Sequence, residues 1–359
     1  MKPIRILIVD DSAAVRRLLR LVLSEDPELE ICGVAANGKI GLALMEQNVP
    51  DVVTLDIEMP EMDGLAALGE IRKRYARLPV IMFSTLTERG AVATLDALAL
   101  GASDYVTKPV TVNDPAQAIA SIRQQLVSRI KSLCRRAEIC TPPPRLELAP
   151  QTSGDFPIDL VAIGASTGGP NALAEVLAAL PTGFPVPVVI VQHMPATFTR
   201  FLAERLSLIC PLPVREAVAG AKLEPGEVWI APGDYHLAVA GSRSICHLQL
   251  LQTPPENSCR PSVDVLFRSA ARIFRQGVLA VVMTGMGQDG LRGAEAVCSQ
   301  GGRVWAQDAA TSVVWGMPGF VVQHGLAQRV LPQGSMGREI ANRVLQSRSR
   351  LTVSAALQI

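Results

Sequence analysis

The sequence predicts two α/β domains, each built around a doubly wound parallel β-sheet. In both halves of the chain, short apolar runs alternate with longer amphipathic segments, as in repeated βα units. A proline-containing stretch at 135–157, with neither helical nor strand periodicity, separates the two series. At 359 residues, the chain is also longer than a single core usually covers. We therefore expect a first domain at 1–125, a linker at 126–156, a second domain at 157–348 and an unassigned terminal segment at 349–359.

The first domain should contain five strands and five helices in alternation. Each apolar run is short enough for a buried strand, and each following segment has helical spacing of its apolar residues. The expected strands are 4–10, 30–36, 51–57, 79–85 and 104–109. The expected helices are 12–23, 40–47, 65–74, 86–100 and 114–134.

The second domain repeats this alternation. Its expected strands are 159–166, 185–193, 227–232 and 278–285, with a hairpin through 237–251. Its expected helices are 169–180, 197–209 and one that follows residue 289. Another parallel sheet covered by helices is the architecture that this pattern favours.

The composition excludes several classes of protein. Lys and Arg total 34 against 33 for Asp and Glu, so no strong field draws the chain to nucleic acid or to a membrane surface. Seven Cys residues without CxxC spacing indicate reduced cytosolic thiols. No apolar run is long enough to span a bilayer or to form a signal peptide. We expect a cytoplasmic monomer that recognises its partner by shape, without membrane insertion.

Acidic residues follow two of the predicted strands in the first domain. Asp10 and Asp11 come directly after the first strand, and Asp56 lies near the end of the third. Because the carboxyl ends of parallel strands meet at one edge of the sheet, these carboxylates should lie close together. Carboxylates in such a cluster repel one another unless a cation joins them, and hard oxygen ligands suit Mg2+. Asp56 is then the candidate nucleophile for an aspartyl phosphate.

Two further residues fit a phosphoryl group at this edge. Ser84 lies at the end of one strand and offers a hydroxyl to a phosphoryl oxygen, and Lys108 follows another strand and offsets the added negative charge. Each residue alone is also compatible with an ordinary surface position. The joint pattern favours a phosphorylation site.

Over residues 4 to about 125, the chain resembles the response-regulator receiver family, through VDDS, DIEMPEMDGL, the position of Ser84 and TKP. The resemblance implies a flavodoxin-like five-stranded sheet and phosphoryl transfer to Asp56 from a chemotaxis histidine kinase. It also implies Tyr105 as the switch residue that responds with Ser84. The Mg2+ ligands that it implies are Asp10, Asp11, Asp56 and the backbone carbonyl of Glu58. Thr85 stands where many receivers carry Ala, which leaves the lifetime of the phosphate open.

In the second domain, VAIGASTGGP runs from a strand through a glycine-rich turn into a helix. Gly164, Ser166 and Gly168 satisfy the G-x-S-x-G elbow that exposes a serine hydroxyl on a sharp bend. The same turn is compatible with a phosphate-binding loop or with close packing alone. The absence of a Lys after Gly169 and of an acidic residue at the end of the next strand counts against a nucleotide site.

Two residues at other strand ends favour the serine elbow. His193 ends an apolar strand, where it could take a proton from Ser166, although a structural histidine is the common alternative. Asp289 follows a later strand and could orient the imidazole; it could equally cap a helix, and both roles are compatible. The glycines around it permit an oxyanion pocket, so the backbone amides of Met286 and Thr167 are candidate donors.

From about 159 to 344, the chain resembles the catalytic domain of chemotaxis protein-glutamate methylesterases, through GASTGGP, VQHMP, APGDYH, RPSVDVLF, MTGMGQDG and SVVWGMP. The resemblance implies a Rossmann-like hydrolase domain without a metal. It carries Ser166 as nucleophile, His193 as general base, Asp289 as its orienting acid, and Thr167 with Met286 at the oxyanion site. It also implies that methyl-accepting chemotaxis receptors are the substrate and that receptor glutamines are deamidated.

Two alternatives belong to other functional classes. A DNA-binding output domain is disfavoured, because no helix-turn-helix block or basic face follows the linker. A non-catalytic scaffold that binds receptors after phosphorylation stays open, although Ser166, His193 and Asp289 are all present. If the second domain is a hydrolase, we expect the receiver to occlude its site until Asp56 is phosphorylated.

Overall fold

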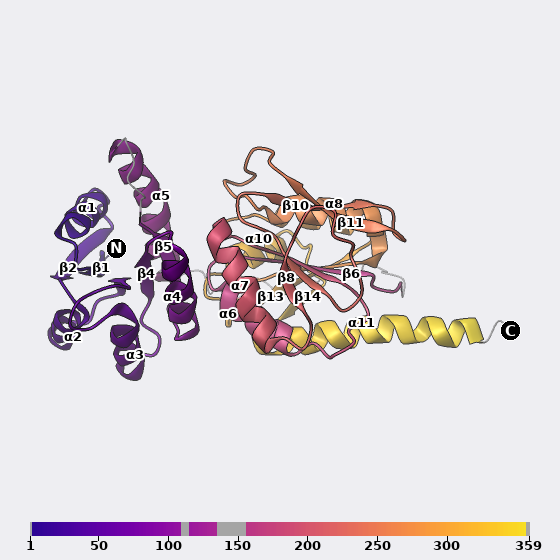
Figure 1. Cartoon of the computed structure of the whole chain (residues 1–359), viewed down its shortest axis with the longest axis horizontal. Helices are drawn as coiled ribbons and strands as arrows, with labels where there is room; N and C mark the ends of the chain where they lie inside the picture. The colour runs from indigo at the N-terminus through magenta and orange to yellow at the C-terminus, as the bar shows by residue number, and fades with distance from the viewer. Residues whose placement is uncertain (1, 109–114, 135–155, 357–359) are drawn as a thin grey trace. The chain divides into compact units, whose positions relative to one another are not determined.

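The structure is a computed structural model that describes residues 2–108, 115–134 and 156–356. The chain divides between Cys140 and Thr141 into two compact units, labelled in Figure 1 and described separately below. Most of the expected linker, at 135–155, and Pro109 of the TKP motif lie outside the described residues. In the described part of the chain, no helix is both long enough and apolar enough to cross a membrane.

The N-terminal unit is built on a five-stranded parallel sheet in the order β2-β1-β3-β4-β5. This is the flavodoxin-like order expected from the sequence. The strands are β1 (Ile4–Val9), β2 (Leu29–Ala35), β3 (Val52–Asp56), β4 (Val80–Ser84) and β5 (Asp104–Thr107). The helices are α1 (Ala13–Ser24), α2 (Gly38–Gln47), α3 (Gly64–Arg74), α4 (Glu88–Ala99) and α5 (Pro115–Cys134).

Local side-chain chemistry fixes where four of these helices begin. Each is preceded by a polar residue whose side chain accepts a hydrogen bond from a backbone amide of the first turn, which would otherwise have no partner. The N-cap residues are Ser12, Asn37, Asp63 and Thr87. Because Ser12 caps α1, the chain must leave the sheet immediately after Asp10 and Asp11, and both acids therefore stay at the sheet edge.

The C-terminal unit contains a seven-stranded sheet in the order β14-β13-β12-β6-β7-β9-β8, with every neighbouring pair parallel. The expected parallel α/β architecture of both domains is therefore confirmed, as is the hairpin. The sheet strands are β6 (Leu160–Ala165), β7 (Val188–Gln192), β8 (Val214–Glu216), β9 (Val228–Ile230), β12 (Val278–Val282), β13 (Arg303–Gln307) and β14 (Arg329–Leu331). The hairpin strands are β10 (His236–Gly241) and β11 (Cys246–Leu251).

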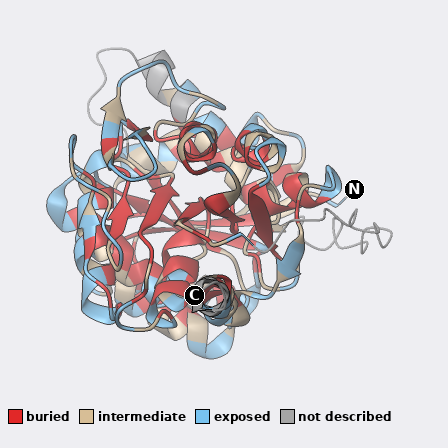
Figure 2. Ribbon diagram, turned by 90° about the vertical axis from the view of Figure 1, so that its right-hand side faces the viewer, coloured by how far each residue is buried: buried red, intermediate tan, exposed pale blue. Residues whose placement is uncertain are grey.

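Helices cover both faces of this sheet. They are α6 (Gly169–Ala178), α7 (Ala196–Ile209), α8 (Val263–Phe274), α9 (Leu291–Ser299), α10 (Met317–Gln323) and α11 (Gln333–Ala356), with a short 3-10 turn at Arg275–Gly277. Helix α8 packs on β6 and on the hairpin strand β10. In Figure 2 most of the sheet strands are coloured as buried, while exposed residues gather on the outer faces of the helices.

Two helices extend beyond the expected domain limits. Helix α5 ends at Cys134, as expected for this helix, and so continues past residue 125, the expected end of the first domain. Helix α11 runs to Ala356 and so includes most of the segment left unassigned at 349–359. In both places helical spacing continues beyond the resemblance on which the boundary was placed.

The position of β6 explains where a ligand can bind. The chain passes from β6 to β7 on one side and later returns to β12 on the other, so the strand order reverses at β6. At such a reversal the loops after neighbouring strands diverge and leave a crevice at the carboxyl edge of the sheet.

Candidate active site and phosphorylation site

The acidic cluster of the N-terminal unit lies at the carboxyl edge of its sheet, as expected. One oxygen from each of Asp10, Asp11 and Asp56 lies within 4.8 Å of the others, close enough for a single cation to contact all of them. Asp10 Oδ2 is buried, and its partner is the Lys108 ammonium described below. Three hard oxygen donors this close together suit Mg2+.

Lys108 contacts two of these acids from the end of β5. Its Nζ lies 2.7 Å from Asp56 Oδ2 and 3.1 Å from Asp10 Oδ2. Burial, together with the charge of Asp10, raises the pKa of Asp56 to about 6 although Lys108 opposes the shift. Burial raises the pKa of Asp10 as well. The ammonium therefore offsets only part of the negative charge in the cluster.

Ser84 and Glu58, which are also expected at this edge, make no side-chain hydrogen bond or ion pair with the acid cluster among the described residues. Ser84 is buried and its hydroxyl donates to the carbonyls of Thr85 and Gly90. Glu58 is exposed and its carboxylate pairs with Arg89, so its side chain does not contribute to the acid cluster. A pocket at this edge is lined by Asp11, Asp56, Ile57, Glu58, Ser84, Thr85, Gly90 and Lys108.

Tyr105 of β5 is buried, and burial raises the pKa of its phenol. Its neighbour Asp104 is ion-paired with Arg129 of α5. A buried ring in the last strand is the position that the receiver resemblance implies for the switch residue.

In the C-terminal unit, Ser166 lies on the bend between β6 and α6. Its amide donates to Thr284 and its carbonyl accepts from Gly169, which closes a tight turn. Gly168 has a φ of 76°, in the left-handed region that favours glycine. A Cβ added to Gly285 would lie 2.8 Å from the Ser166 Cβ, so the loop after β12 needs a glycine to pass this close.

His193 and Asp289 meet at the crevice. Ser166, His193 and Asp289 follow β6, β7 and β12, which are adjacent in the sheet order β12-β6-β7. His193 Nε2 lies 2.8 Å from Asp289 Oδ2. Residues separated by 96 positions in the sequence are therefore brought into a hydrogen-bonded pair by the sheet topology alone.

Asp289 also lies at the N-terminus of α8. Its carboxylate accepts hydrogen bonds from the backbone amides of Val263 and Asp264 and from the Ser262 hydroxyl, at 2.7, 3.2 and 2.7 Å. Asn257 adds a fourth donor at 3.0 Å. The sequence allows Asp289 to be the N-cap of a helix. The N-cap of the next helix, α9, is Gly290. The Asp289 carboxylate instead caps α8, which lies earlier in the chain.

These neighbours shift the pKa values of the pair in opposite directions. Burial would raise the pKa of Asp289, but hydrogen bonds from His193, Ser262 and Val263 lower it to about 2. Burial would lower the pKa of His193, but its hydrogen bond with Asp289, together with Cys259, raises it above its usual value. Asp289 is thus an ionised carboxylate at neutral pH that holds the Nε2 proton of the ring.

A second buried acid lies beside this pair. Asp264, the second residue of α8, accepts hydrogen bonds from the amides of Gly290 and Gly293 and from Asn257. Burial raises its pKa to about 6, and the charge of Asp289 adds to the shift. Asn257 donates to both carboxylates, so it bridges the two acids.

The third member of the expected triad is close in the fold but not hydrogen-bonded. In the described part of the chain, no hydrogen bond joins the Ser166 hydroxyl to His193. Cys259 Sγ instead lies 3.6 Å from His193 Nδ1. Catalytic hydrogen bonds are often long in a free enzyme and tighten when substrate binds, so this geometry is compatible with a serine nucleophile.

The two residues expected at the oxyanion site lie in different loops. Thr167 directly follows Ser166, and Met286 lies in the loop after β12. Thr167 is buried and its carbonyl accepts from the Thr284 hydroxyl. The Met286 amide follows the close-packed Gly285 and precedes Gly287, whose φ is 83°. This loop conformation brings backbone near the serine, as an oxyanion pocket requires.

The other histidines have structural environments. His236 is fully buried; it bonds to the carbonyl of Pro254 and accepts from the Ser262 amide, so it supports the loop before α8. His247 lies in β11. His324 ends α10 and bonds to the carbonyl of Phe320.

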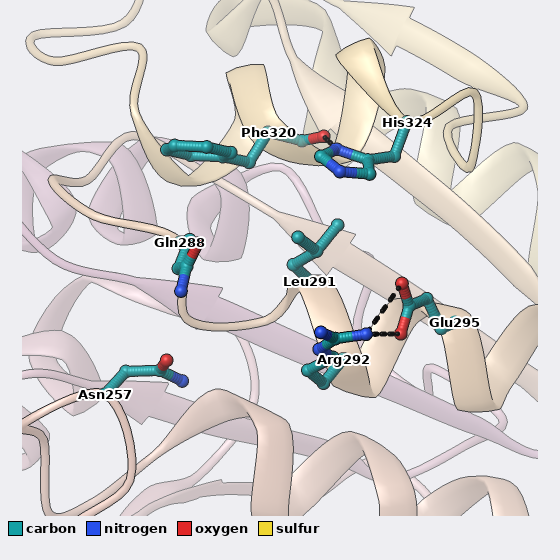
Figure 3. A pocket seen from close by; sticks show the side chains of 7 residues that line it. All are labelled: Asn257, Gln288, Leu291, Arg292, Glu295, Phe320 and His324. Carbon is teal, nitrogen blue, oxygen red and sulfur yellow. Dashed lines mark hydrogen bonds and ion pairs between the residues drawn. The ribbon is translucent and has the colours of Figure 1, made fainter.

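A surface pocket adjoins Asp289 through Asn257, which lines the pocket and donates to that carboxylate. Figure 3 shows that its side chains come from the loop before α8, from the start of α9 and from the end of α10. Arg292 and Glu295 form an ion pair on one wall, and Phe320 supplies an apolar surface on another. The lining residues are Asn257, Gln288, Leu291, Arg292, Glu295, Phe320 and His324.

Comparison with known proteins agrees with this geometry. Residues 161–340 match the family model of the CheB methylesterase, and residues 6–120 match that of the response regulator receiver domain. Two relatives named protein-glutamate methylesterase/protein-glutamine glutaminase, from Trichodesmium erythraeum and Nocardioides sp., are each 50% identical to the chain. The matches cover 96% and 99% of this chain and 100% of each relative.

A solved structure resembles the C-terminal unit. The CheB methylesterase catalytic domain of Thermotoga maritima is 42% identical and aligns with a TM-score of 0.51 over 52% of this chain and 98% of that one. With a receiver-type sheet that carries an acid cluster and a hydrolase-type sheet that carries a His–Asp pair beside a serine elbow, the chain belongs to the family of protein-glutamate methylesterase/protein-glutamine glutaminases.

Proposed function

We propose that the protein hydrolyses glutamyl methyl esters on methyl-accepting chemotaxis receptors through Ser166, His193 and Asp289. The observation that carries the proposal is the His193–Asp289 hydrogen bond beside the serine elbow, at the reversal point of the sheet. A hydrogen-bonded His–Asp pair next to a serine on a strained turn is the arrangement of acyl-transfer enzymes on several unrelated folds.

The contacts of His193 assign the roles of its two nitrogens. Nε2 donates to Asp289, so the lone pair available for general-base catalysis is on Nδ1. Ser166 Oγ attacks the ester carbonyl while Nδ1 takes its proton. The imidazolium then returns that proton to the departing methoxide, which leaves as methanol. Water hydrolyses the resulting acyl-enzyme by the same steps, with the Thr167 and Met286 amides stabilising the oxyanion.

The same chemistry accounts for deamidation. A receptor glutamine presents a carboxamide in place of the ester, and the leaving group is then ammonia. In both reactions a glutamate carboxylate appears on the receptor and restores negative charge. Because like charges on neighbouring helical positions repel, each turnover shifts the receptor toward the signalling state that methylation disfavours, which is sensory adaptation.

The decisive experiment compares methanol release from methylated receptor membranes by wild type and by Ser166→Ala. We expect Ser166→Ala to lose activity by at least about 10^4-fold, because the oxyanion site and binding alone supply only residual rate enhancement. Ser207→Ala, on α7, is the matched control. Equal rates for wild type and Ser166→Ala would leave the non-catalytic scaffold as the better assignment.

For the N-terminal unit we propose phosphorylation at Asp56 by a chemotaxis histidine kinase in the cytoplasm. Asp10, Asp11, Asp56 and the carbonyl of Glu58 would hold Mg2+, which offsets the charge of the phosphoryl group. Lys108 already contacts Asp56 and remains beside its phosphorylated form, and Ser84 would turn from the Gly90 carbonyl toward a phosphoryl oxygen. Tyr105 follows that movement as the switch residue.

We further propose that the receiver inhibits the hydrolase until Asp56 is phosphorylated. A phosphoryl group adds about two negative charges and can shift an equilibrium between closed and open arrangements. A fragment from about residue 155 onward should therefore be more active than the unphosphorylated full chain. Equal activity of the fragment and the full chain would refute the inhibition and leave the hydrolase assignment intact.

A further inference from the structure

Cys259 occupies a position that the esterase mechanism does not use. Its Sγ lies 3.6 Å from His193 Nδ1, the nitrogen assigned above to proton transfer. A short hairpin holds the thiol there: Glu256 and Cys259 exchange backbone hydrogen bonds, and Asn257 and Ser258 both have positive φ. Cys259 is half-buried, so the thiol is ordered by the turn and still reaches solvent.

The separation of the two atoms matches the bite of a metal ion. Zn2+ binds nitrogen at about 2.0 Å and thiolate sulfur at about 2.3 Å with tetrahedral angles, which places the donor atoms about 3.5 Å apart. The observed 3.6 Å between Nδ1 and Sγ agrees with this separation. Nitrogen and thiolate together select a soft or borderline cation over Mg2+.

The surroundings of His193 complete the requirements for a metal ligand. Histidines that bind metals commonly donate their other ring N–H to a carboxylate, which fixes the ring and raises its basicity. His193 Nε2 already makes that bond to Asp289. Since Asp289 also accepts from the N-terminus of α8, it is better placed to orient the ring than to leave these donors and bind the metal.

We infer that His193 Nδ1 and Cys259 Sγ form a chelating site for a thiophilic divalent cation such as Zn2+, and that occupation of this site switches the hydrolase off. On binding, Cys259 gives up its thiol proton to solvent and the metal takes the Nδ1 lone pair. Water fills the remaining coordination positions. His193 can then no longer accept the Ser166 proton, so inhibition follows directly from coordination and is reversed by a chelator.

Binding and inhibition are separate parts of this inference, and only the inhibition rests on the proposed esterase function. Binding is measured on the full chain with Co2+ as a spectroscopic substitute for Zn2+, with excess Mg2+ to fill the receiver acids. A thiolate ligand produces a near-ultraviolet charge-transfer band that carboxylate ligands do not. We expect this band to titrate to one equivalent in wild type, to vanish in Cys259→Ala and to persist in Ser166→Ala.

Cys298→Ala is the matched control for binding, because Cys298 is also half-buried but its thiol donates a hydrogen bond to the carbonyl of Leu326 and has no histidine partner among the described residues. Its band should equal that of wild type. A wild type without the band, or a band that survives in Cys259→Ala, would overturn the site, whether or not the protein proves to be an esterase.

Inhibition is measured as the ratio of methanol release with and without Zn2+ within each variant, so that a change in basal rate does not matter. We expect at least a tenfold weaker apparent inhibition constant in Cys259→Ala than in wild type and in Cys298→Ala. Full activity of wild type at a Zn2+ concentration that saturates the site would refute the regulatory role while leaving the site itself in place.

Discussion

Asp56 and Asp289 are both buried carboxylates beside the carboxyl edge of a parallel sheet, yet their neighbours give them opposite properties. Asp56 lies beside another acid and has one cation, and its pKa rises to about 6. Asp289 receives hydrogen bonds from a helix N-terminus, two side chains and His193, and its pKa falls to about 2. Each of the two sheets places a carboxylate at its carboxyl edge. The number of hydrogen-bond donors around that carboxylate then determines which chemical role it can take.

This difference separates two kinds of site. An acid cluster with few hydrogen-bond donors is stabilised when it binds a cation. It can then accept a phosphoryl group, because the cation offsets the negative charge. A carboxylate with every lone pair engaged is held in one orientation, which suits a group that positions an imidazole. Three measurements test this contrast.

The largest effect is expected from Asp289→Asn. An asparagine can present an amide N–H to His193 Nε2, which would place the ring proton on Nδ1 and remove the general base. We expect kcat for methanol release to fall by about 10^4-fold, the size of effect seen when a triad acid selects the wrong tautomer. Asp234→Asn is the control, since Asp234 is exposed and pairs with Arg260. A loss below tenfold would mean that Asp289 serves α8 alone.

A smaller effect is expected from pH in the metal-free receiver. The folded-state pKa of Asp56 lies above its ordinary value of 3.8, so the folded protein binds more protons than the unfolded chain between about pH 4 and pH 6. Its contribution to stability is therefore present at low pH and is lost as pH rises through that window. Wild type should lose about 2 kcal/mol of unfolding free energy as pH rises from about 4 to 6, and Asp10→Asn should lose less, because burial, the main cause of the raised pKa, remains in that variant.

Hydrogen-exchange protection of the β1 and β3 amides in the full chain measures this loss within the receiver. Saturating Mg2+ should remove the difference between wild type and Asp10→Asn, or reverse it. If wild type and Asp10→Asn show the same pH dependence without Mg2+, burial alone raises the Asp56 pKa and repulsion from Asp10 contributes nothing.

The smallest effect is expected from Ser262→Ala. Ser262 precedes α8 but its hydroxyl makes no capping bond to that helix; it donates to Asp289 Oδ1 instead. The Val263 and Asp264 amides remain after the substitution, so we expect a loss of about 1 kcal/mol in unfolding free energy and a fall in kcat of a few-fold. Ser299→Ala on the exposed end of α9 is the control. A loss of activity as large as that of Asp289→Asn would show that the Ser262 hydroxyl alone, and not the whole set of donors, orients the Asp289 carboxylate.

The strands that carry site residues could be predicted from the sequence because each is a short apolar run ending in a polar residue. Asp10, Asp56, Ser166 and His193 all lie at such ends. Strands β8, β13 and β14 are not among the expected strands. The short strands β8 and β14 are partly exposed, so they lack the continuous apolar run that marks the equally short β9. Helix α8 is also not among the expected helices, because its first residues, VDV, alternate apolar and polar and are compatible with a strand.

The supporting contacts of the catalytic acid could not be predicted. Ser262, Asn257 and Asp264 reach Asp289 across more than twenty sequence positions, and only the packing of α8 against β6 brings them there. Cys259 was dismissed as one of several reduced thiols. Its proximity to His193 depends on a two-residue turn with positive φ at Asn257 and Ser258, for which Asn is a weak sequence signal and Ser is none.

The capping of α8 by Asp289 also bears on how related sequences are to be interpreted. One carboxylate serves both the folding of the domain and the orientation of its base, so a descendant that lost esterase activity would still be under pressure to keep an acid at this position. Retention of Asp289 in a homologue is therefore poor proof of catalysis. Ser166 makes no side-chain hydrogen bond among the described residues, so its hydroxyl is dispensable for folding, and its presence or loss is the more informative marker of a working enzyme.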